Sequence, residues 1–414
     1  MVLIVVFSVY QGNVKAQTLS LDSCKTLALR NNKKIIEANY EIQASTEVKK
    51  NAFTNYFPKV SANAFSMKSQ DYLIQLSPEV GLDYLNLASI MVAQPVFTGG
   101  RIYNGNRLAT IGTEINKLKQ SLTTKEVLAK TEELYWNIIA LNEKKKTLES
   151  YDKLLDTLLK DVTIATKAGL VQRNDLLKVQ LKKNEIALNK LKLKNGISLS
   201  KKALCQHIGL PYNESINIET RMESIALQKP LFADAVKAVT KRDEYQMLNT
   251  AVKASELQKK MIIGENLPQL SIGAFGFYQD AMKQTGTNAI GFVSLSIPLT
   301  DWWGGSHKIK EQQIKTNEAQ NKLQETSELL VLQINQAQND LDETFFQIGN
   351  AQKSVEQAGE NLKVTNDNYK AGVSTMSDLL EAQSTYQQAL DNLTEAKCNY
   401  QIKSVKYQQA IGAY

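Results

Sequence analysis

Apolar positions along this chain follow two spacings, one typical of helices and one typical of strands. In residues 101–167 and 304–370 apolar side chains recur at steps of three and four, which is the heptad pattern of coiled-coil helices. Residues 21–57 and 232–267 also place apolar positions at helical spacing. Shorter segments with alternating or small apolar residues predict strands. The four expected strands cover 59–70, 85–97, 269–279 and 289–299.

These elements occur twice in the same order. A helix, two strands, a long helix, a turn and a last helix fill 17–209, and the same series fills 232–414. We therefore predict a duplicated unit, with a connector over 210–231 that contains a short strand at 215–220. The expected turns are 168–174 and 371–377, and the expected last helices are 175–208 and 378–411.

The residues around the two turns support the duplication directly. Residues 167–209 align with 370–412 without a gap, and 12 of 43 positions are identical. Each turn contains a glycine, Gly169 or Gly372, which permits the positive φ that a reversal between antiparallel helices needs.

The lengths of the helices favour a tube over a globule. The two long helices have 67 residues each, which corresponds to roughly 100 Å at the helical rise. Two shorter helices placed end to end would match one long helix, so each repeat would supply two columns of equal height.

The strands favour a membrane barrel shared between subunits. Their 11 to 13 residues suffice to cross a bilayer at a tilt, whereas four strands are too few to close a barrel. Open strand edges are not tolerated in lipid, so other subunits must complete the barrel, and three copies would supply twelve strands. Trp302 and Trp303 follow the last strand, where an interfacial aromatic belt and a packed core are both open interpretations.

The first residues indicate export. Residues 1–10 are nearly all apolar, and small or aliphatic residues precede a possible cleavage site before Gln17, which predicts a signal peptide over 1–16. Cys24, Cys205 and Cys398 are far apart and lie on expected helices, so we expect buried thiols, while lipidation of Cys24 stays an open alternative.

Composition and charge exclude several classes of function. The net charge is +7, but Lys alternates with Glu and Asp along the helices, which favours solvated helix faces over nucleic-acid binding. No segment approaches the length and apolarity of a membrane-spanning helix. The two histidines are 100 positions apart, and we find no catalytic set, metal motif or phosphate loop, so we expect no enzyme activity, metal or cofactor.

These features resemble the TolC family of outer-membrane efflux proteins, over essentially the whole chain after the signal. The resemblance rests on the strand exits Gln94–Arg101 and Ile297–Gly305 and on the two turns with their following Asp175 and Asp378. It implies a mostly α homotrimer with a twelve-stranded β-barrel in the outer-membrane lipid and a long α-helical coiled-coil tunnel in the periplasm. It also implies a periplasmic adaptor and an inner-membrane transporter as partners, for efflux of drugs or for secretion.

The resemblance assigns residues to two sites. The turns would bind the adaptor through Ala168, Gly169, Leu170, Ala371, Gly372 and Val373. Asp378 and Glu381 match an acidic pore constriction, while capping of the following helix is the alternative for Asp378. Tyr369 and Asp175 match positions that hold the tip closed. Ser374 departs from the family, because some relatives carry a basic residue there.

One other class of protein uses similar heptads. A periplasmic coiled-coil scaffold without a channel would share the long helices, but it has no use for four strands placed symmetrically between them. The sequence does not distinguish a duct for small molecules from a duct for secreted proteins.

Overall fold

The computed structural model describes residues 18–71, 73–77, 80–214, 216–219, 231–282, 284–299 and 301–414. The predicted signal peptide at 1–16 and much of the predicted connector lie outside these residues. Backbone contacts divide the chain into two compact units. The first contains the residues up to Glu37, Ser121–Arg242 and Glu328–Tyr414, and the second contains Ala38–Gln120 and Asp243–Ser327. Each unit draws on both sequence repeats, so the compact units are not the repeats themselves; the division into repeats stays a prediction.

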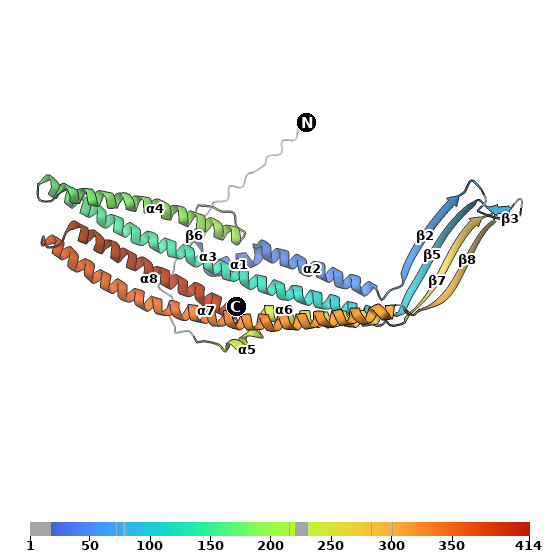
Figure 1. Cartoon of the computed structure of the whole chain (residues 1–414). Helices are drawn as coiled ribbons and strands as arrows, with labels where there is room; N and C mark the ends of the chain where they lie inside the picture. The colour runs from blue at the N-terminus through green and yellow to red at the C-terminus, as the bar shows by residue number, and fades with distance from the viewer. Residues whose placement is uncertain are drawn as a thin grey trace, which may run out of the picture. The chain divides into compact units, whose positions relative to one another are not determined.

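The first unit is built on two helical hairpins. Helices α3 (Arg101–Lys167) and α4 (Arg173–His207) form one, and α7 (Asp301–Lys370) and α8 (Met376–Ala410) form the other. The hairpins meet where α3 contacts α8, and Figure 1 shows the four helices in the order α4, α3, α8, α7. The helix expected over 101–167 has the observed bounds, while α4, α7 and α8 each begin two or three residues earlier than expected.

Two helices expected to be continuous are each broken. The segment 21–57 forms α1 (Leu21–Asn31) and α2 (Lys33–Thr54), because Asn32 adopts an extended backbone at φ −65° and ψ 128°. The segment 232–267 forms α5 (Ala235–Val239) and α6 (Asp243–Glu265). Periodicity alone did not predict either break, since the apolar spacing continues across both.

The breaks have one physical reason, and it recurs in both repeats. The side chain of Asn32 donates a hydrogen bond to the carbonyl of His207 at 2.7 Å, at the end of α4. Arg242 donates to the carbonyl of Ala410 at 3.1 Å, at the equivalent end of α8. A helix end leaves carbonyls without helical partners, so a side chain at the break satisfies one of them.

The chain also packs closely at the first break. Gly209, which follows α4, has a φ of 69°, and a Cβ added there would lie 2.5 Å from the Cβ of Asn31.

The second unit contains one antiparallel sheet with the strand order β2-β5-β7-β8. Its strands are β2 (Lys59–Lys68), β5 (Tyr84–Phe97), β7 (Gln269–Ala281) and β8 (Gln284–Ser296). The central pairing of β5 with β7 joins the two repeats, and Ile90 lies opposite Gly276 in its register. Strands β2 and β8 are the edges, and neither has a second partner in the described part of the chain.

The predicted bounds of the loops between the strands were partly wrong. Strands β7 and β8 extend through most of the predicted loop 280–288, with Met282 at a φ of 51° in the tight turn between them. Strand β8 ends at Ser296, three residues before the predicted end. The predicted loop 71–83 contains a small hairpin of β3 (Ile74–Ser77) and β4 (Val80–Leu82). Trp303 is 82% exposed, which excludes a packed-core role within this chain.

Two short strands pair in parallel near the end of α4 in the first unit. Strand β1 (Thr18–Leu19) pairs with β6 (Asn217–Ile218), which lies inside the strand predicted at 215–220. The three cysteines form no disulfide with one another and are buried in the apolar cluster beside this pairing, as expected. Burial raises the pKa of the Cys24 thiol to about 12, and a fully buried side chain is a poor acceptor for a lipid. None of the helices in the described ranges combines the length and apolar character that would span a bilayer.

Replacing Asn32 tests the side-chain cap at the first break. We expect Asn32→Ala to lower the free energy of unfolding by about 1–3 kcal/mol, because it leaves a partly buried carbonyl of α4 without its donor. Chemical denaturation measures the change, and Asn31→Ala is the matched control. Equal stability of Asn32→Ala and the wild-type protein would contradict the capping role.

Candidate functional site

The candidate site is the group of residues around the two helix turns in the first unit. Both turns reverse in the same way: Gly169 and Gly372 have φ values of 73° and 76°. The amide of Leu170 donates to the carbonyl of Ala165 at 2.9 Å, and the amide of Val373 donates to that of Asn368 at 2.8 Å. These bonds satisfy carbonyls at the ends of α3 and α7.

The six predicted adaptor-binding residues lie at these turns and are all exposed. Leu170 is 79% exposed and Val373 is 75% exposed, although the residue at this position of such a turn commonly packs back on its own helix. Each turn therefore presents one large apolar side chain beside two small residues. The adaptor role of Ala168, Gly169, Leu170, Ala371, Gly372 and Val373 stays a prediction.

Asp378 caps the start of α8. Its carboxylate accepts from the amide of Thr375 at 2.8 Å and from the Thr375 hydroxyl at 2.7 Å, while its own amide donates to that hydroxyl at 3.2 Å. These hydrogen bonds from Thr375 hold the pKa of Asp378 below its ordinary value, with a smaller contribution from Lys178. Glu381 lies one turn further along α8 and is exposed. Asp378 is thus a capping residue of α8. A second role of Asp378 in a pore stays a prediction.

The structure brings Asp175 and Tyr369 close together, although they lie in different repeats. Burial and then the nearby carboxylates of Asp175 and Asp161 raise the pKa of Tyr369, so its hydroxyl stays a donor at neutral pH. In the part of the chain described, no hydrogen bond joins Tyr369 to Asp175.

Lys178 connects the two hairpins, and sequence reasoning had assigned it no role. Its ammonium lies 3.4 Å from Asp175 on its own helix and donates to the hydroxyl of Ser377 on α8 at 2.8 Å. Sequence comparison had shown only that Lys178 stands where the second repeat has Glu381. The spacing of Asp175 and Lys178 along one helix face was the available signal.

Met376 fills the space between the hairpins at this end. It is 1% exposed and packs in an apolar cluster with Val162 of α3 and Val179 of α4, with Tyr369 at the edge. The equivalent residue of the first repeat is Arg173, which is exposed. Ser374 lies in the turn, where its amide lies 3.3 Å from the carbonyl of Asn368. At this end the two hairpins are therefore joined by an apolar contact and by Lys178, and position 374 holds no basic side chain.

Further from the turns the contact between the hairpins becomes polar. Thr147 of α3 donates to Asp391 of α8 at 2.6 Å, and Lys144 of α3 forms an ion pair with Glu395 of α8 at 2.7 Å. Burial raises the pKa of Asp391. Within the residues the structure describes, no three His, Cys, Asp or Glu side chains are arranged to hold a metal ion.

Shortening Met376 tests its role at the contact. We expect Met376→Ala to lower the free energy of unfolding by about 2–5 kcal/mol, because it leaves a cavity between α3, α4 and α8. Met376→Leu keeps the volume and should cost less than about 1.5 kcal/mol. Thermal and urea unfolding measure both variants. If Met376→Ala were as stable as Met376→Leu, the contact would carry little of the stability of this end.

Comparison with known proteins matches this chain to outer-membrane proteins and channels. Residues 263–413 match the model of the family described as outer membrane efflux protein. The outer membrane protein TolC of Escherichia coli is 19% identical over 344 residues, which cover 78% of this chain and 69% of that protein. The Campylobacter jejuni outer membrane channel CmeC has the same fold, with a TM-score of 0.82 and 16% sequence identity, and the match covers 95% of this chain and 85% of that one. The Vibrio cholerae outer membrane protein VceC matches with a TM-score of 0.79 and 14% sequence identity, over 95% of this chain and 96% of that one.

Proposed function

We propose that this chain is a member of the TolC family of outer-membrane efflux proteins, and that three copies form the exit duct of a tripartite efflux or type I secretion system. The duct receives drugs or other substrates from an inner-membrane transporter and a periplasmic adaptor and passes them across the outer membrane. It performs no enzymatic reaction. The observation that carries the proposal is the open four-stranded sheet of the second unit.

The two sheet edges require partners from other chains. Strands β2 and β8 are ten and 13 residues long, and each presents one row of amides and carbonyls without a strand partner among the described residues. In hydrocarbon such groups cost several kcal/mol each, so membrane sheets close into barrels. Four strands are too few to close alone, and barrels of a single chain begin at eight. Three copies of this sheet supply twelve strands.

The register distributes the side chains of the sheet over two faces. One face carries small and aliphatic side chains, among them Val60, Ala62, Ile90, Val92, Ile272 and Val293, together with Lys68, Asn86 and Asp280 toward one end. The opposite face alternates polar side chains with large apolar ones, among them Lys59, Asn63, Ser89, Gln279, Asn288, Phe65, Leu87, Met91, Phe275 and Phe292. Both faces therefore carry apolar positions, and the proposed barrel rests on the open edges of the sheet.

The helical hairpins offer a second contact between neighbouring copies. Within the chain, α3 packs against α8 through Thr147–Asp391 and Lys144–Glu395. The repeat makes α7 equivalent to α3 and α4 equivalent to α8. The same contact between neighbouring chains would therefore join α7 of one copy to α4 of the next, with Asn350 opposite Leu188.

The surfaces of α4 and α7 are complementary. Helix α4 contains nine Lys and Arg residues and two Asp and Glu residues, which gives a net charge of +7. Residues 328–370 of α7 contain three Lys residues and seven Asp and Glu residues, which gives a net charge of −4. Both helices also leave large apolar side chains exposed, and those of α4 follow one face. On α4 they are Leu177, Leu181, Leu188, Leu191 and Leu199, and on this part of α7 they are Leu329, Leu332, Phe346 and Val364.

A coiled-coil scaffold without a channel explains less. Such a protein would use the helical hairpins, but it would leave both edges of a four-stranded sheet with exposed apolar side chains unpaired in water, which is a route to aggregation. The exposed turns fit the duct as well, because Leu170 and Val373 would offer the adaptor apolar contacts beside small residues.

Reconstitution tests the duct directly. We expect the full-length protein, extracted from outer membranes, to run as a detergent-stable trimer and to give single-channel conductance in planar bilayers. Leu188→Glu should weaken the trimer, because it places a carboxylate opposite the acidic α7, whereas Lys160→Glu on exposed α3 surface is the matched control. A monomer without conductance would refute the proposal.

The acidic residues after the second turn are proposed to line the narrow end of the duct. In a trimer, Asp378 and Glu381 would each form a ring of three carboxylates, which favours cations and binds multivalent ones. We expect Asp378→Asn with Glu381→Gln to weaken the blockade of single-channel current by trivalent cations at least tenfold. Asp342→Asn with Glu343→Gln, on α7, is the control. Unchanged blockade would leave Asp378 with its capping role alone.

A further inference from the structure

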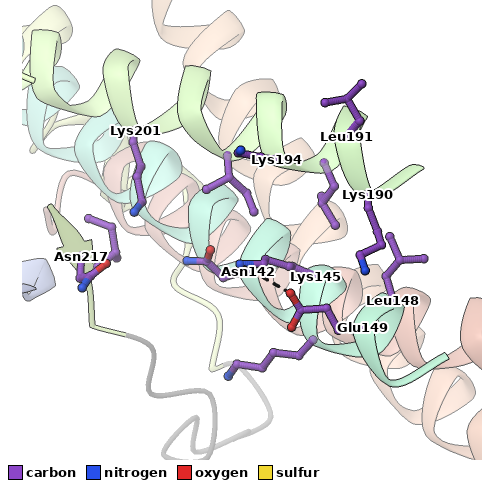
Figure 2. A pocket seen from close by; sticks show the side chains of 13 residues that line it. Asn142, Lys145, Leu148, Glu149, Lys190, Leu191, Lys194, Lys201 and Asn217 are labelled. Carbon is purple, nitrogen blue, oxygen red and sulfur yellow. Dashed lines mark ion pairs between the residues drawn. The ribbon is translucent and has the colours of Figure 1, made fainter. Parts of the chain in front are cut away.

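A cavity rich in lysine lies between α3 and α4 in the first unit. Its volume is about 710 Å³, and it extends to Asn217 and Ile218 of β6. Figure 2 shows the side chains around it, which come from both helices and from this strand. Five lysines line the cavity against a single carboxylate, that of Glu149. The lysines are Lys145, Lys146, Lys190, Lys194 and Lys201.

Partners within the chain neutralise only part of this charge. Lys146 and Lys190 form ion pairs with Glu143 at 2.6 Å and Asp152 at 2.7 Å. Lys145 lies 3.7 Å from Glu149, a separation marked in Figure 2. Lys201 donates to a neutral group, the carbonyl of Ile216, at 2.7 Å. Lys194 forms no ion pair with any described residue. Two ammonium groups, those of Lys194 and Lys201, thus have no carboxylate partner at the cavity.

The second repeat shows that the fold itself does not require this cavity. The positions equivalent to Asn142, Lys145, Lys190 and Ile197 are Phe345, Ile348, Leu393 and Tyr400. These four residues belong to a packed apolar cluster, in which Ile348 is 2% exposed and the rings of Phe345 and Tyr400 lie 6.2 Å apart. One copy of the same helix pair therefore has a filled core where the other has a basic cavity.

A packed core stabilises a helix pair, so its replacement by a cavity needs another explanation. Lysines on a solvated helix face would explain exposed charge but not a hollow lined also by Leu148, Leu193, Ile197 and Ile218. Pockets for small molecules have volumes of about 300–1,000 Å³ and combine apolar walls with a few placed polar groups. The cavity has these properties, with positive charge as its polar element.

We propose that this cavity binds a small amphiphilic anion, a molecule with one carboxylate, sulfonate or phosphate group and an apolar body. The anionic group lies between Lys194 and Lys201, and the apolar body lies on Leu148, Leu193 and Ile197. The lysine pair is separate from the centre of the surface proposed for subunit contact, because Leu177, Leu181, Leu188 and Leu199 do not line the cavity, whereas Leu191 lies at the border of both. Binding of the anion at this cavity does not depend on whether the protein conducts ions.

Equilibrium dialysis against the full-length protein in nanodiscs of zwitterionic lipid tests the site, with labelled decanoate as the probe and empty nanodiscs as the blank. We expect saturable binding of one decanoate per chain. Decylamine, which has the same chain and the opposite charge, should bind at least tenfold more weakly. Lys194→Gln with Lys201→Gln should weaken decanoate binding at least tenfold, whereas Lys153→Gln with Lys160→Gln, on exposed α3 surface, should leave it unchanged.

A second variant fills the cavity with the residues of the other repeat: Asn142→Phe, Lys145→Ile, Lys190→Leu and Ile197→Tyr. We expect it to lose decanoate binding and to unfold at a higher temperature than the wild-type protein. Either of two results would overturn the proposal: equal binding of decanoate and decylamine, or undiminished decanoate binding by the Lys194→Gln and Lys201→Gln protein. Displacement of decanoate by dioctanoyl phosphatidylglycerol at equal concentration would support the proposal and would identify a lipid headgroup as a source of the anion.

Discussion

The constraint on which this protein depends is the pairing of backbone groups at the edges of its sheet. Each repeat contributes one hairpin, and the contact of β5 with β7 joins the two hairpins through twelve residue pairs. The edges β2 and β8 then remain without a partner among the described residues. In lipid an unpaired edge is far more costly than any side-chain contact in the molecule could offset. In the proposed outer-membrane duct, a single chain is therefore not the working unit, and the pairing of the edges favours closure by further copies.

The predicted duplication accounts for a chain that repeats its architecture while its two copies differ in chemistry. The copies keep what the backbone requires: Gly209 and Gly412 at the ends of α4 and α8, and a side-chain donor, Asn32 or Arg242, at each helix break. They differ in charge: helix α4 has a net charge of +7 and α8 has one of −1, from three Lys against four Asp and Glu. This difference suits the proposed assembly, in which α4 would face a neighbouring copy while α8 contacts α3 of its own chain.

Much of the fold could be predicted from the sequence, because long heptads and alternating strands are strong periodic signals. The bounds of α3 and the presence of all four barrel strands followed from them. The breaks at Asn32 and before Asp243 could not be predicted, because they depend on hydrogen bonds to residues about 170 positions away. The strand ends near Met282 were missed because polar residues continue through the tight turn.

The candidate site was predictable only in outline. The family resemblance assigned Tyr369 and Asp175 to holding the tip closed; the structure places the Asp175 carboxylate near enough to raise the pKa of Tyr369, and their role at the tip stays a prediction. The connection by Lys178 and the burial of Met376 depend on how two hairpins from different repeats approach each other, which periodicity within one helix does not specify. The lysine cavity likewise becomes visible only when the two helix pairs are compared residue by residue.

Cross-linking between α4 and α7 tests the central claim, closure by neighbouring copies, most directly. Cysteines introduced by Leu188→Cys and Asn350→Cys occupy the positions equivalent to the hydrogen-bonded pair Asp391 and Thr147. In outer membranes, mild oxidation should link the chains into a covalent trimer on denaturing gels, while each single variant stays monomeric. A double variant that oxidises only to monomer, in membranes that contain the folded protein, would contradict the account.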